Sequence, residues 1–78
     1  MYKLKFEENN EGIIIKTEQK TFRKLIAWIK ENIIHYYPIS NCKVKIERVH
    51  SSGASEIIAD GNGLEILDLI KIADEGMD

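Results

Sequence analysis

The chain has 78 residues, 44% of them hydrophobic and 31% charged, and its formal net charge is −2 at pH 7. This composition indicates one small folded domain over residues 1–78 and excludes a disordered tail. No apolar run approaches the ~20 residues that a bilayer span requires, and the lone Cys42 excludes an internal disulfide and is typical of a reducing compartment, so we expect a soluble, cytoplasmic protein.

The first two segments are predicted to form a β-hairpin. Tyr2, Leu4 and Phe6 alternate with charged residues over residues 2–7, which is the period of a strand with one buried face. A turn-rich cluster follows, and a β-branched run over residues 12–17 predicts the second strand.

A helix is predicted over residues 18–35. Thr17 is the expected N-cap, and Pro38 lies just beyond the last helical turn, where it disfavours helical geometry in the residue before it. The apolar residues of this segment recur with the spacing of one helical face: Phe22, Leu25, Ile26, Ile29 and Ile33.

The second half repeats the order of two strands and a helix. Val44 and Ile46 alternate with charged residues over residues 42–50, and a short β-branched run at residues 56–60 predicts a partner strand. Residues 64–75 are predicted to be helical. The order β-β-α-β-β-α indicates an α+β fold, a single two-layer domain with a mainly antiparallel four-stranded sheet and two helices on one face.

The stretch from Asp60 to Gly63, Asp-Gly-Asn-Gly, reads like the centre of a calcium-binding loop. Such a loop anchors its ion with carboxylates at positions that Ile58 and Leu69 occupy here, so a hard cation would not be held. We therefore expect the stretch to begin the last helix, with Asn62 as N-cap and Glu65 as its capping-box partner.

The sequence offers no catalytic or metal-binding constellation. The soft metal ligands are Cys42, His35 and His50, whereas a structural zinc site normally uses four. Acidic residues such as Glu8 cluster around the first turn and are expected to be solvated, without the apolar pocket that acid–base catalysis needs. We therefore predict no catalytic residues, no metal and no cofactor.

Four lysines are expected on the sheet face that the helices leave open: Lys3, Lys5, Lys43 and Lys45. Such a face is either a solvated surface, a site for phosphates or a site for an acidic protein. Open-sheet RNA binders also present stacking aromatic residues, whereas Tyr2 and Phe6 are expected in the core.

Four apolar or aromatic residues are candidates for a partner-binding surface: Trp28, Ile34, Tyr36 and Tyr37. On a helical wheel, Trp28 and Ile34 each lie about 120° from the apolar stripe on opposite sides, so at least one is expected to be exposed. Large aromatic residues that a small core cannot absorb often mark interfaces.

The leading hypothesis is a non-enzymatic protein-binding module, an adaptor or an inhibitor of the kind that phages encode against host proteins. Its partner would be another protein or a second copy of the chain. The alternative is a nucleic-acid-binding domain that uses the lysine-rich open face. The salt dependence of binding distinguishes the two hypotheses, because lysine–phosphate contacts weaken steeply as the salt concentration rises.

Overall fold

Two antiparallel hairpins join side by side into one four-stranded sheet. The computed structural model describes residues 1–76. The centre of the sheet consists of β1 (Tyr2–Glu8) and β3 (Cys42–Val49), and its edges are β2 (Ile13–Gln19) and β4 (Ser55–Asn62), in the order β2-β1-β3-β4. All three strand pairs are antiparallel.

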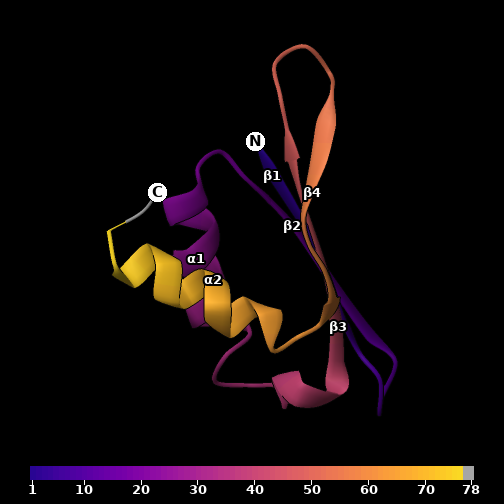
Figure 1. Ribbon diagram of the computed structural model, residues 1–78. Helices are drawn as coiled ribbons and strands as arrows, with labels where there is room; N and C mark the ends of the chain where they lie inside the picture. Colours follow the sequence, from indigo (N-terminus) through magenta and orange to yellow (C-terminus); the bar gives the residue numbers. More distant parts are fainter. Residues whose placement is uncertain (77–78) are drawn as a thin grey trace.

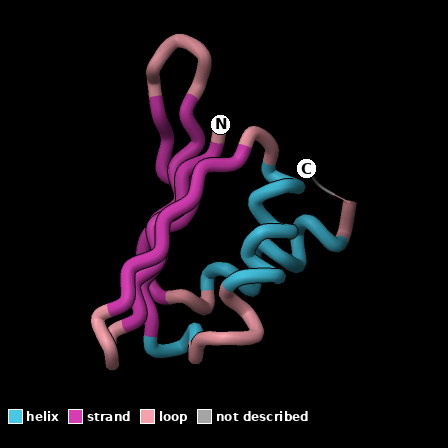
Figure 2. Tube along the Cα trace, turned by 180° about the vertical axis from the view of Figure 1, so that it is seen from behind, coloured by secondary structure: helices cyan, strands magenta, loops and turns pink. Residues whose placement is uncertain are grey.

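Two helices cover one face of this sheet and leave the other bare (Figures 1 and 2). The first, α1 (Phe22–Asn32), contacts β2, and the second, α2 (Glu65–Asp74), contacts β4 and α1. A short 3₁₀ turn, η1 (Ile39–Asn41), leads into β3. The predicted α+β class, the element order and the one-sided helix layer are confirmed.

The core lies between the sheet and the helices. It consists mainly of the apolar residues that repeat with the strand period or the helix period in the sequence. Its aromatic centre is Phe6, whose ring lies 5.5 Å from that of Tyr37. The buried apolar residues are Leu4, Phe6, Leu25, Ile26, Ile29, Ile33, Cys42, Val44, Ile46, Ala59 and Ile66.

The predicted start of the first helix is wrong, because β2 continues to Gln19 and α1 begins only at Phe22. Thr21 is the N-cap, and its hydroxyl accepts a hydrogen bond from the Lys24 amide at 3.1 Å. Thr17 lies instead on β2, opposite Leu4. The apolar stripe begins only at Phe22, so the preceding residues satisfy their backbone groups by pairing with β1.

The predicted cap of the second helix is also wrong. β4 runs to Asn62, which pairs with Lys43, so the strand predicted at residues 56–60 is present but longer. The Asn62 side chain accepts from the amide of Leu64 at 2.8 Å, and Leu64 occupies the N-cap position without a side-chain bond. Asn62 therefore shapes the turn before the helix, and Glu65 is not a capping-box partner.

The β3–β4 hairpin extends past the rest of the sheet and the helix layer (Figure 1). Its tip closes with two backbone bonds, from the His50 amide to the Ala54 carbonyl and from the Gly53 amide to the His50 carbonyl. All residues from His50 to Ile57 are exposed. The tip therefore holds its shape by local hydrogen bonds rather than by packing.

Gly63 is required where the chain passes from β4 to α2. It is buried, its amide donates to the Cys42 carbonyl at 2.8 Å, and a Cβ there would overlap the carbonyl oxygen of Ile39. We expect Gly63→Ala to lower the free energy of unfolding by about 1–3 kcal/mol, measured by urea denaturation, because η1 must move.

The matched control is Gly12→Asn. Gly12 has a φ of 70°, and the space that a Cβ would occupy there is open; asparagine tolerates that backbone conformation. The control should change the free energy of unfolding by less than about 1 kcal/mol. Equal losses in the two variants would contradict a steric role for Gly63.

Candidate functional site

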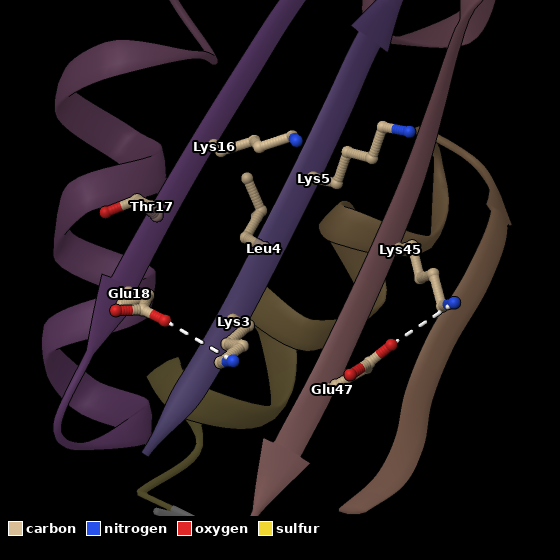
Figure 3. Close-up of a pocket in the computed structure, with 8 residues that line it drawn as sticks. All are labelled: Lys3, Leu4, Lys5, Lys16, Thr17, Glu18, Lys45 and Glu47. Carbon is tan, nitrogen blue, oxygen red and sulfur yellow. Dashed lines mark ion pairs between the residues drawn. The ribbon is translucent and has the colours of Figure 1, made fainter.

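The open face is the side of the sheet that the two helices leave bare (Figures 1 and 2). Its middle carries three lysines directly opposite one another, because Lys5 pairs with Lys16 on β2 and with Lys45 on β3. Figure 3 shows these three amines projecting to the same side from neighbouring strands. We call them the lysine row. Like charges in directly opposed positions destabilise a sheet, so the row is a local conflict of the kind that often accompanies function.

A shallow hollow of about 500 Å³ lies over β2, β1 and β3 on this face. Both positively and negatively charged side chains line it, as Figure 3 shows. The residues that line it are Lys3, Leu4, Lys5, Lys16, Thr17, Glu18, Lys45 and Glu47.

Carboxylates interleave with the lysines of the open face. Five lysines and four acidic residues share this face of the sheet. They are Lys3, Lys5, Lys16, Lys43 and Lys45, and Glu7, Glu18, Glu47 and Asp60. The ion pairs join Lys3 to Glu18 at 3.6 Å, Lys5 to Glu7 at 3.0 Å and Lys45 to Glu47 at 3.2 Å. Within residues 1–76, Lys16 and Lys43 have no ion pair. The face is therefore a mixed-charge surface with a positive centre.

Two isoleucines stand on this face at opposite corners. Ile14 on β2 is 57% exposed, and Ile57 on β4 is 52% exposed. Ile57 reaches the open face because a bulge shifts the β3–β4 register, so that Glu47 pairs with Ile57 while Ile46 pairs with Ala59. The two central strands between them, β1 and β3, present chiefly charged residues on this face, so the apolar contacts available to a partner are at the corners.

The structure places all four predicted lysines on the open face, and it adds Lys16 and Glu18 to them. The sequence prediction missed these two because the run Ile13 to Ile15 has no alternation, and the predicted strand ended at residue 17. The hairpin register could have placed Lys16, because counting residues outward from the turn along both strands sets Lys16 opposite Lys5.

The predicted partner-binding residues do not form one exposed patch. Trp28, Ile34 and Tyr37 are half-buried and pack against the core, whereas Tyr36 is 70% exposed. The expectation that at least one of Trp28 and Ile34 would be exposed is wrong, because both pack against the core. For Ile34 the helical wheel does not apply, since α1 ends at Asn32.

Cys42 and Glu8 are buried beside each other on paired strands, with 2% and 4% exposure. The Glu8 carboxylate accepts from the amides of Asn10 at 2.6 Å and Glu11 at 2.9 Å, so it stabilises the first turn and is not solvated as predicted. Burial, and then the charge of Glu8, raises the pKa of the Cys42 thiol. A protonated, enclosed thiol is a poor nucleophile.

We expect the Cys42 thiol of the folded protein to react with a disulfide reagent at least about tenfold more slowly than that of the urea-unfolded chain. The folded pKa is raised, so the thiol's contribution to stability is present below its ordinary pKa of about 8.5 and is lost as pH rises through the folded pKa. Urea midpoints measured at about pH 7 and about pH 10 should therefore fall more for the native chain than for Cys42→Ala. Rapid labelling without urea would contradict this placement.

Comparisons with protein-family models, with curated proteins and with solved structures find no match for this chain. Neither helix within residues 1–76 has both the length and the apolar character needed to cross a bilayer. In the same part of the chain, no three His, Cys, Asp or Glu side chains gather closely enough to hold a metal ion.

Proposed function

We propose that this protein is a non-enzymatic protein-binding module, an adaptor or inhibitor that docks its partner on the open face of the sheet. The observation that carries the proposal is the uncovered face itself, with interleaved charges and exposed isoleucines at two corners. Protein surfaces carry both signs of charge, so a mixed face can be complementary to one and can select its orientation.

The chemistry of the open face supports binding rather than catalysis. The hollow is shallow, and its charged groups are amines and carboxylates, most of them already in ion pairs. The buried nucleophile Cys42 lies on the opposite, helix-covered face, where its thiol donates to the Pro38 carbonyl at 3.3 Å. An enzyme would need reactive groups that converge on a substrate pocket.

Nucleic acid is the second candidate partner, and the lysine row is the observation that favours it. Against it, carboxylates flank the lysine row and pair with Lys5 and Lys45, and both Tyr2 and Phe6 point into the helix-covered side rather than onto the open face. Single-stranded nucleic acid is usually held by aromatic stacking together with positive charge. The balance of charges and the missing aromatics favour a protein.

The test is affinity capture from an extract of the cells that encode the protein, with and without nuclease, followed by binding measurements on the purified partner. We expect a protein that survives nuclease treatment and whose affinity falls by at least about tenfold in the double variant Lys5→Glu/Lys45→Glu. The control is Lys71→Glu, an exposed lysine on α2 in the opposite layer. It should bind normally.

Fluorescence anisotropy with labelled RNA and DNA tests the alternative directly. If four lysines contacted phosphates, the affinity would fall about tenfold for each doubling of salt. Micromolar binding with that salt dependence, lost in Lys5→Glu/Lys45→Glu, would replace the protein-binding proposal with nucleic-acid binding. Equal capture by the native chain and the double variant would remove the open face as the site.

A further inference from the structure

The two free edges of the sheet differ in their readiness to accept another strand. β4 carries a bulge where the register shifts between Ile46 and Glu47, and bulges blunt an edge against pairing. β2 pairs without interruption over seven residues, and it contains neither glycine nor proline. A regular edge strand presents a row of unpaired backbone groups, which is a template for another strand.

The side chains of β2 are complementary to a second copy of β2 in one register. In the register where Thr17 faces Thr17 of the second copy across a two-fold axis, Lys16 lies opposite Glu18 of that copy, and Glu18 lies opposite its Lys16. If Lys16 faced its own copy, two lysines would be opposed. If Glu18 faced its own copy, two glutamates would be opposed. Opposed charges of unlike sign stabilise a strand pair and like charges destabilise it, so the Thr17 register is favoured.

Lys16 is the residue that gains most from this pairing. In the single chain it lies directly opposite Lys5, and within residues 1–76 it has no ion pair. Glu18 pairs only loosely with Lys3, at 3.6 Å. The second copy would provide the carboxylate that Lys16 lacks.

The helix layer carries an aromatic residue toward the same edge. Lys30 pairs with Asp74 at 2.9 Å, so this side of α1 faces α2. At 100° per residue Trp28 lies about 160° around the helix from Lys30, on the opposite side. Because α1 contacts β2 and α2 contacts β4, the side of α1 away from α2 faces the free edge of β2.

Trp28 also lies level with Thr17. Tyr2 pairs with Gln19 and its ring packs 5.9 Å from that of Phe22, so α1 begins beside the end of β2. From there Thr17 is about 7 Å back along the strand, and Trp28 is about 9 Å along the helix.

The helix runs back along β2, because Tyr37 beyond its end packs on Phe6, which pairs with Ile15. A two-fold axis through Thr17 and normal to the sheet therefore passes near Trp28 in the layer below.

We propose that the protein forms a symmetric dimer in which β2 pairs with β2 of a second copy through the Thr17 register. The two sheets become one eight-stranded sheet, and the Trp28 sides of the two α1 helices face each other beneath it. This proposal stands independently of the partner proposed for the open face, since it concerns the strand edge and a second copy of the same chain.

The decisive experiment is sedimentation velocity on charge-reversed variants, with circular dichroism to check the fold. The native chain should sediment as a concentration-dependent dimer. Lys16→Glu alone opposes two glutamate pairs and Glu18→Lys alone opposes two lysine pairs, so each should weaken self-association by about tenfold or more. An equal mixture of the two variants restores both unlike pairs and should dimerise again.

Lys43→Glu is the matched control, because Lys43 is also an open-face lysine without an ion pair in residues 1–76 but lies on the central strand β3. It should dimerise like the native chain. Trp28 is the only tryptophan, so its fluorescence should shift to shorter wavelength as the native chain associates. A native monomer at millimolar concentration, dimers unaffected by Lys16→Glu, or a mixture that stays monomeric would each overturn the proposal.

Discussion

The pairing of β1 with β3 is the contact on which the rest of the structure depends. Each half of the chain supplies a hairpin and a helix, and this central pair joins the halves into one sheet. It opposes Leu4 to Ile46 and Phe6 to Val44 on the covered face, and thereby continues the core from one hairpin to the other. Because the side-chain period of a strand is two, the same register fixes which residues share the open face.

The β1–β3 register sets Lys45 opposite Lys5, and the β1–β2 hairpin adds Lys16 to the lysine row. Lys5 and Lys45 are 40 positions apart in the chain, yet the burial of their apolar neighbours forces the two amines into directly opposed positions. A slip by one residue would separate them but would turn Phe6 into solvent. The core therefore holds the repulsive row in place, and the neighbouring carboxylates of Glu7 and Glu47 reduce its cost.

The sequence predicted the architecture because the apolar residues of β1, β3 and α1 repeat with the period of their element. It predicted the boundaries less well, since Glu18 and Gln19 suit either a strand or the first turn of a helix. Pairing with β1 decides in favour of the strand. The burial of Glu8 was missed because its partners are backbone amides of the next turn, which leave no pattern in the residue types.

The candidate site was predicted in part for the same reason. Lys3, Lys5, Lys43 and Lys45 alternate with apolar residues, so their common face could be read directly. Lys16 follows three consecutive isoleucines, where alternation gives no phase, and only the strand register places it. The side of α1 on which Trp28 lies depends on which neighbour the helix packs against, and the sequence period alone does not contain that information.

The projecting β3–β4 hairpin places one end of the molecule outside the packed layers (Figure 1). Its tip, from His50 to Ala54, closes on its own backbone bonds and is exposed throughout. Exposed tips of this kind accept inserted residues with little effect on the packed layers. A fluorophore or affinity tag could therefore be built into Ser51–Gly53, away from β2 and from the lysine row, and would report on the molecule without altering either surface.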